Sequence, residues 1–295
     1  DDALGSMQVS GPLLWSVFSV FGAFGAGTLA VIGRSVGAGD TVRARETLRS
    51  VLSLAMGMGL VVAVLGIFGR TWITEALSSD VLTSDSVRGM ACDYLGIVVA
   101  VAPLAMTGAI GFTALQASGD TRTPAIISAI CGVCNLLLSV IFVYGLWWAP
   151  EMGIVGAAIG SAASFSLQGM LALYCCQQPG RPLCLRPIGA FRLGPLKSVF
   201  RVSIPAIGEK LIFHTVFVIF AGYVAHLGDR AMTANQACIA IESVGFISAF
   251  GFGVASSAVV AQKLGAGSTE DAEACGWISM QMGIVFLTGI GLMML

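Results

Sequence analysis

Eight long apolar runs constrain this chain more than any other feature of its sequence. A transmembrane helix needs about 20 predominantly apolar residues, and inside a bilayer only helices or closed barrels satisfy the backbone polar groups. The runs are unbroken and do not alternate with a period of two, which favours helices over strands. The pattern predicts an all-α, polytopic membrane protein. The expected spans are approximately 8–35, 48–69, 88–116, 124–147, 153–176, 200–227, 231–262 and 272–295.

The composition excludes several classes of protein. Hydrophobic residues make up 56% of the 295 residues and charged residues only 11%, whereas soluble proteins carry about a quarter charged residues. The expected surroundings are therefore membrane lipids. The net charge is -1 and no basic, aromatic-interleaved patch is present, so nucleic acid is not an expected partner. The two histidines, His214 and His226, do not form an HExxH motif. We therefore expect no enzyme and no cofactor.

A polar interruption divides the chain. The segment "QQPGRPLCLRPIGAFRLGPLKSV" holds four prolines and several basic residues. We expect an N-terminal lobe at 1–177, a cytoplasmic linker at 178–199 and a C-terminal lobe at 200–295.

Basic residues predict the orientation. Eleven of the fifteen Lys and Arg residues lie in or directly beside the loops after the first, third, fifth and seventh spans, and three lie in or beside the other loops. Positively charged loops face the cytoplasm. The loops that contain Arg43, Arg122, Arg186 and Lys263 are therefore expected there, and the chain start on the outer side. The expected location is the plasma (inner) membrane, crossed several times.

One loop sequence occurs twice in the chain. "VGAGDTVRA" begins at Val36 and "LGAGSTEDA" at Leu264, and Gly37 and Gly265 differ by 265 − 37 = 228 positions. An ungapped shift of 228 aligns the first span and the helix after it with the seventh and eighth spans. The second copy comes six helices after the first, and an even number gives both the same direction across the membrane. We therefore predict two parallel halves related by an axis along the membrane normal.

The repeated loop has a phosphate-binding alternative. Glycine-rich loops can cradle phosphate, but no strand precedes this one and no Lys-Ser or Lys-Thr follows it. A helix-to-helix turn is the favoured interpretation. Gly37 and Gly39 are expected to take left-handed conformations after the first helix, and Asp40 or Ser268 to cap the next helix.

Several segments, taken together, resemble the multidrug and toxic compound extrusion (MATE) transporters. They are "GTLAVIGRSVGAGD" at 27–40, "LQASGDTRTP" at 115–124 with Asn135 after it, "MGIVGAAIGSAAS" at 152–164, and "IPAIGEKLI" at 204–212. The resemblance implies twelve helices in two six-helix lobes. This chain would then hold helices 2–9 of a longer protein, with one helix before it and three after it. A central cavity between the lobes is also implied.

The resemblance also implies a cation site in the N-terminal lobe. Many members carry Asn and, four residues later, Asp in the fifth helix. Here Asn135 is present but Ser139 stands at the second position. Ser161 occupies a place where Ser or Thr is a common ligand. Asn135, Ser139 and Ser161 are thus the expected Na⁺ ligands, or alternatively Asn135 only joins two helices by a hydrogen bond.

Ionisable residues within spans are costly and usually functional. Glu209 and Glu242 are the candidates to bind a substrate or a coupling cation, with His214 and Gln116 as further polar residues of the cavity. The structural alternatives are a pair of Glu209 with Lys210 or with another helix, a pairing of Glu242 with a helix expected beyond this chain, and helix-contact roles for His214 and Gln116.

These expectations lead to a functional hypothesis. The chain is expected to belong to a monomeric secondary transporter that exports amphipathic, mostly cationic compounds in exchange for Na⁺ or H⁺. The alternative is a lipid-linked saccharide flippase of the same superfamily. Such proteins often place several Arg or Lys residues in the cavity, whereas here Lys210 alone lies in the interior of a span and the other basic residues lie at span ends or in loops.

Overall fold

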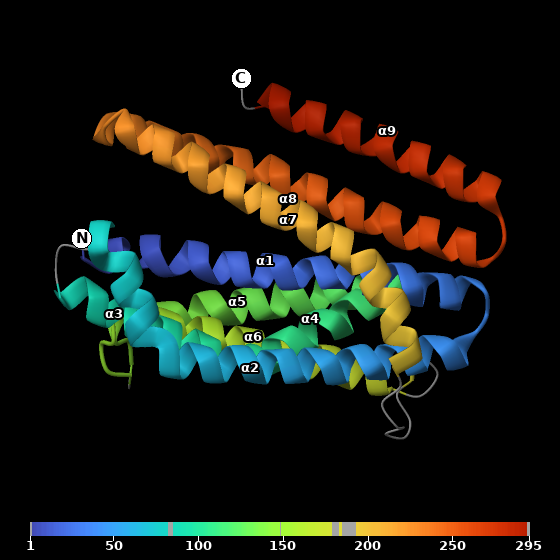
Figure 1. Ribbon diagram of the computed structural model, residues 1–295, viewed down its shortest axis with the longest axis horizontal. Coiled ribbons are helices and arrows are strands. Elements are labelled where there is room, and N and C mark those ends of the chain that lie inside the picture. Colours follow the sequence, from blue (N-terminus) through green and yellow to red (C-terminus); the bar gives the residue numbers. More distant parts are fainter. Residues whose placement is uncertain (1, 82–84, 148, 179–182, 185–192, 294–295) are drawn as a thin grey trace.

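The computed structural model describes residues 2–81, 85–147, 149–178, 183–184 and 193–293, and gives no side-chain account of 1–18. The described residues form nine helices: α1 (Asp2–Gly37), α2 (Thr41–Val81), α3 (Asp85–Ala100), α4 (Ala102–Ala117), α5 (Arg122–Tyr144), α6 (Ile154–Gln177), α7 (Leu193–His226), α8 (Asp229–Gly265) and α9 (Thr269–Met293). The all-α expectation is confirmed. Figure 1 shows α1–α6 as one bundle, with α7–α9 lying across its side.

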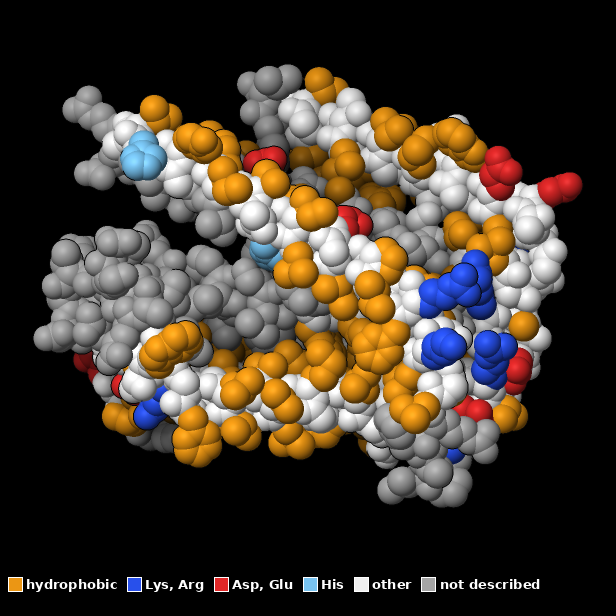
Figure 2. Space-filling view, in the orientation of Figure 1, with side chains coloured by type: hydrophobic (Ala, Val, Ile, Leu, Met, Phe, Trp, Pro, Cys, Tyr) orange, Lys and Arg blue, Asp and Glu red, His pale blue; other side chains and the backbone are white. Residues whose placement is uncertain are grey.

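The described helices have the dimensions of membrane spans. Six of them are long and apolar enough to cross a bilayer, and a bent pair would add a seventh. Large apolar side chains are exposed on the outer faces, including Phe68 at 82% and Val285 at 73%. Figure 2 shows hydrophobic side chains spread along the described helices on the visible face. Such a surface is stable only in contact with lipid or further helices.

The third expected span, 88–116, consists of two helices in the structure, α3 and α4. The axes of α3 and α4 differ by 52°, and the break falls at Val101, just before Pro103 in the first turn of α4. Proline lacks an N–H and its ring clashes with the preceding turn, so it favours a helix start over a helix interior. By contrast, Pro205 lies inside α7 without ending it.

The expected linker range overlaps the start of a helix. Helix α7 begins at Leu193, inside the range 178–199 that the sequence assigned to the linker. Residues 179–182 and 185–192, which include Arg186, lie outside the described part of the chain.

Three turns meet at one end of the molecule, which we call the turn end. They are the α1–α2 turn at 38–40, the α4–α5 turn at 118–121 and the α8–α9 turn at 266–268. Gly37 packs against the backbone of Gln262, and Gly33 lies near both Ala261 and the carbonyl of Ala117. Lys and Arg side chains gather over this end in Figure 2. The opposite end, with the α7–α8 turn, is called the far end.

The two copies of the repeated loop have the same backbone. Ala38 N–H donates to Arg34 O at 3.0 Å, and Ala266 N–H donates to Gln262 O at 2.9 Å. Gly39 has φ +72° and Gly267 has φ +81°. The left-handed conformation expected at Gly39 is confirmed, but Gly37 is helical and serves a packing role instead.

The same residues place a two-fold axis between α1 and α8. Gly37 contacts Gln262, and Gly265 contacts Arg34; the offset 262 − 34 equals 228, as does 265 − 37. Gly33 contacts Ala261. These two residues are counterparts of each other in the repeat, because 261 − 33 is also 228. Contacts that persist when the two partners are exchanged define a two-fold relation. The predicted parallel repeat is therefore confirmed, and its axis passes through the Gly33–Ala261 crossing.

Candidate functional site

Helix α1 forms the seam between the two lobes. Its small residues at positions 27, 33 and 37 allow the backbones of α7 and α8 to approach closely: added methyl groups there would overlap Ser203, Ala261 and Gln262. Small residues at such positions are typical of tight helix contacts in membranes. A continuous buried core surrounds the seam; it includes Phe24, Ile32, Leu48, Met106, Leu115, Val199 and Ala258.

Polar contacts reinforce this seam. Ser203 of α7 is fully buried, and its hydroxyl donates to the Phe24 carbonyl of α1 at 3.3 Å. The Phe24 and Phe200 rings meet edge to face, with centroids 5.3 Å apart. These contacts lie in the half of α1 that leads to the turn end. Toward the far end, α7 and α8 diverge from α1 (Figure 1).

Sequence reasoning missed Gln262, which joins three helices. Its side-chain Nε2 donates to the carbonyl oxygen of Ala117, the last residue of α4, at 2.7 Å. Its backbone carbonyl also packs against the backbone of Gly37 in α1. The available signal was its place near Gly265 in the second copy of the repeat. No local rule connects it with a residue 145 positions away.

The candidate acidic residues lie on the helices that diverge. Glu209 is on α7 and Glu242 is on α8, and both side chains are exposed in this structure. His214 is half-buried on α7, and its ring lies edge-on to Phe213 with a centroid distance of 6.0 Å. The predicted roles of Glu209, Glu242 and His214 in binding stay predictions.

Lys210 has aromatic neighbours. Its Nζ lies 6.0 Å from the ring centroids of both Phe213 on α7 and Phe250 on α8. Phe213 also stacks on Phe246 with centroids 6.3 Å apart. Cation–π attraction operates at about this distance. The charge of Lys210 is thus placed between α7 and α8, beside two aromatic rings.

The proposed N-terminal lobe ligands come together between α5 and α6. Asn135 Nδ2 lies 3.4 Å from Ser161 Oγ. Ser139, one turn along α5, packs against Gly160, which immediately precedes Ser161. The Ser164 hydroxyl donates to the Cys131 carbonyl at 2.8 Å. Hydroxyl and amide oxygens therefore line this helix pair, and the interhelical hydrogen bond named as the alternative for Asn135 is present.

Gln116 lies close to the turn end. It is half-buried near the end of α4, and its carbonyl accepts a hydrogen bond from Gly119 N–H at 3.0 Å. Its predicted part in a central cavity stays a prediction, because the recorded contact is a backbone bond of the α4–α5 turn.

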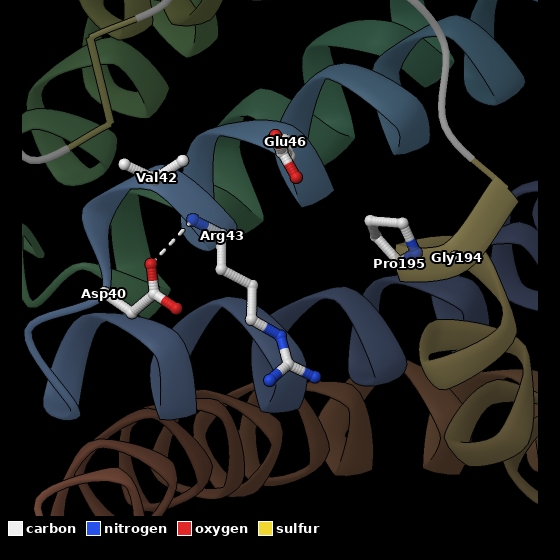
Figure 3. A pocket seen from close by; sticks show the side chains of 6 residues that line it. All are labelled: Asp40, Val42, Arg43, Glu46, Gly194 and Pro195. Carbon is white, nitrogen blue, oxygen red and sulfur yellow. Dashed lines mark hydrogen bonds between the residues drawn. The ribbon is translucent and has the colours of Figure 1, made fainter.

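Two cavities lie away from the candidate residues. One, of about 490 Å³, separates the start of α2 from the first turn of α7; Asp40, Arg43 and Glu46 face Gly194 and Pro195 across it. Figure 3 shows the Arg43 backbone N–H donating to the Asp40 carboxylate, a bond of 2.9 Å. The other cavity, of about 380 Å³, lies among α2, α3 and α6 and is lined by Arg70 and Asp93.

Comparison with known proteins decides the family. A family model described as MatE matches residues 1–141 and 205–295, which include both copies of the repeated loop. The chain is a member of the MatE family. The family resemblance drawn from the sequence motifs is therefore confirmed.

Two relatives of this MatE chain are named as a multidrug resistance protein and a transporter. It is 24% identical to a probable multidrug resistance protein NorM of Thermotoga maritima over 98% of this chain and 62% of the relative. It is 26% identical to a FAD transporter of Shewanella oneidensis over 97% of this chain and 63% of the relative. The chain thus spans a little under two thirds of the length of these relatives.

Solved structures support the fold. A crystal structure described as MATE in the straight conformation superposes with a TM-score of 0.86 at 19% identity, and it covers 97% of this chain and 62% of that one. The helix arrangement of this MatE chain is therefore the fold of that structure.

Proposed function

We propose that the complete protein exports amphipathic, mostly cationic compounds in exchange for Na⁺ or H⁺ by alternating access. The observation that carries this proposal is the asymmetry between the two ends. The lobes are sealed around α1 at the turn end by Gly33, Gly37 and Gln262, whereas α7 and α8 diverge from α1 toward the far end (Figure 1). Rocking the lobes about the two-fold axis would open one end as it closes the other.

The orientation follows from the same proposal. The turn end carries the loops of Arg43, Arg122 and Lys263, and basic loops favour the cytoplasm. In the described conformation, the end that this orientation places in the cytoplasm is then the closed one.

The acidic residues give the exchange its chemistry. Glu209 and Glu242 lie on the two helices that diverge, where a substrate between the lobes would meet them. A carboxylate that holds a proton or Na⁺ cannot attract an organic cation equally well, so the two ligands compete. Inward movement of one charge along 100 mV supplies about 2.3 kcal/mol for export. The Asn135–Ser161 pair would offer oxygen ligands to a coupling ion in the other lobe.

Ethidium efflux from an efflux-deficient host under imposed Na⁺ or pH gradients tests this proposal. Glu209→Gln should lower the gradient-driven efflux rate at least several-fold. Glu151→Gln, which makes the same change in the α5–α6 turn, is the matched control and should have no effect. If cells with the unaltered protein retain the same amount of dye with and without a gradient, the proposal is contradicted. Unchanged efflux from cells with Glu209→Gln would remove that residue from the mechanism.

Export of an aromatic anion is a second candidate. The Lys210 ammonium beside the Phe213 and Phe250 rings offers charge and stacking together, and one relative is named a FAD transporter. Extracellular flavin measured alongside ethidium efflux separates the two candidates. Lys210→Gln should lower export of an anion, whereas for a cationic substrate it should leave export unchanged or raise it.

A further inference from the structure

The end of α4 has a carbonyl that its own turn does not use. The last carbonyls of a helix lack intrahelical donors. In the α4–α5 turn, Ser118 N–H donates to Ala114 O, Gly119 N–H to Gln116 O, and Asp120 N–H to Leu115 O. The Ala117 carbonyl instead receives the Gln262 side chain from α8. A helix end of one lobe is therefore completed by a side chain of the other lobe.

The turn is shaped to admit that side chain. Gly119 has φ +89°, and a Cβ at this position would lie 3.3 Å from Gln262 Nε2. A side chain here would therefore strain the backbone and crowd the amide. The Gln262 backbone is also fixed, because Gly37 packs directly on its carbonyl. The amide reaches α4 from a position that α1 already determines.

We propose that Gln262 is a latch that holds the turn end closed. Its amide bonds to Ala117 only while the two lobes meet at this end, so the bond adds stability to that conformation alone. The proposal rests on the alternating-access function and adds a residue that sets its conformational equilibrium. The latch is one-sided, because the two-fold counterpart of Gln262 is Arg34 (262 − 34 = 228), whose side chain is exposed.

The expected size of the effect is moderate. When the lobes separate, water can satisfy both the amide and the carbonyl, so only the net value of one hydrogen bond is lost. That value corresponds to a shift of roughly two- to ten-fold in the ratio of open to closed molecules. A bond that forms in only one of two states shifts their populations by the free energy that it contributes to that state.

Ser203 provides a reporter that does not depend on transport. Its side chain is fully buried in the α1–α7 seam, so Ser203→Cys should react with a membrane-impermeant maleimide only when the turn end opens. The experiment uses the complete protein with its native cysteines replaced, in membranes whose turn-end side is accessible. The labelling rate of Cys at 203 is compared with and without Gln262→Met, which keeps the length of the side chain and removes the donor.

Gln262→Met should raise the labelling rate roughly five-fold. Ser257→Ala is the matched control on α8, because the Ser257 hydroxyl is exposed and bonds only to Gly253 of its own helix in the recorded contacts; it should leave the rate unchanged. Gln262→Ala is a second variant, so that poor folding of one does not decide the outcome. Equal labelling rates in the unaltered protein and a folded Gln262 variant would overturn the latch.

The failure of the latch and the failure of the proposed function can be told apart. If dye efflux depends on the gradient but labelling ignores Gln262, the latch is wrong and the function stands. If labelling responds to Gln262 while no dye moves, the latch stands and the substrate assignment is wrong.

Discussion

The two copies of the repeated loop share one backbone but different side chains. In each copy the residue after the helix donates to the carbonyl four residues back, at 3.0 Å for Ala38 and 2.9 Å for Ala266. Each copy then places a glycine at positive φ. The side chains that follow differ: Asp40 corresponds to Ser268, and Arg43 corresponds to Asp271.

The acidic residue that starts the second helix occupies a different position in each copy. In the first copy Asp40 caps α2, and its carboxylate accepts the Arg43 N–H at 2.9 Å. In the second copy the carboxylate belongs to Asp271 in the first turn of α9, 3.2 Å from the Lys263 ammonium. Both arrangements put negative charge at a helix N-terminus, where the helix dipole favours it. The comparison teaches that glycines and packing fix the turn, while its capping chemistry is exchangeable.

The largest expected effect is on the shared backbone contact. Gly37→Ala and Gly265→Ala would each push a methyl group into the backbone of the opposite helix, at Gln262 and Arg34 respectively. Overpacking of this kind costs about 2 kcal/mol. Because the contacts are two-fold related, the two variants should be destabilised equally. Equilibrium unfolding of the complete protein in mixed detergent–SDS micelles measures both values.

Glycines in open space provide the control for this prediction. A methyl group at Gly22 on α1 or Gly253 on α8 would meet nothing within 4 Å. Alanine at these positions should leave stability unchanged or raise it by up to about 1 kcal/mol, since alanine favours helix more than glycine. A large difference in unfolding free energy between Gly37→Ala and Gly265→Ala would show that the two symmetry-related contacts do not contribute equally to stability.

The second effect concerns the left-handed residues. Gly39 and Gly267 have φ +72° and +81°, and neither has a heavy atom near the position of an added Cβ. Alanine at either position should cost about 1–2 kcal/mol through backbone strain alone. Asparagine tolerates this conformation better, so Gly39→Asn should recover part of the loss. The same unfolding titration measures it, and equal stability of the Ala and Asn variants would argue against strain.

The third effect should separate the copies. Asp40→Ala removes the hydrogen bond to Arg43 N–H, and loss of an N-cap costs about 1 kcal/mol. Ser268→Ala should cost less, because Asp271 retains the negative charge at the start of α9 together with its Lys263 partner. Stability of the two variants relative to the unaltered protein checks the order. A larger loss for Ser268→Ala would show that the acid at Asp271 does not replace a cap.

The backbone of these turns could be predicted from the sequence because it depends on short-range rules. The repeat of 228 positions, the positive φ of Gly39 and the Asp40 cap all follow from local spacing. The role of Gly37 was predicted wrongly, since a local rule treated it as a helix end. In the structure a distant helix touches it, and no sequence window contains both partners.

Two prolines show the same limit within helices. Pro103 coincides with a 52° break, while Pro205 lies in a continuous α7. The sequence alone does not tell which of the two prolines coincides with a helix end. For the same reason, Asn135 and Ser161 could be matched by the motif, whereas the Gln262–Ala117 bond could not be foreseen. The side-chain roles of Glu209 and Glu242 stay predictions.

The smallest expected effect belongs to the ion pair that only the second copy has. Lys263 and Asp271 lie 3.2 Å apart, with side chains 43% and 59% exposed, and their first-copy counterparts are Ser35 and Arg43. Exposed pairs of this kind contribute between 0 and about 1 kcal/mol and are screened by salt. Lys263→Gln should therefore lower stability by less than about 0.5 kcal/mol at low salt, and by nothing measurable in 1 M NaCl. Unfolding titrations at the two salt concentrations test this. A loss that persists in high salt would mean that Lys263 acts by packing, and that the second turn relies on this side chain as well as on its glycines.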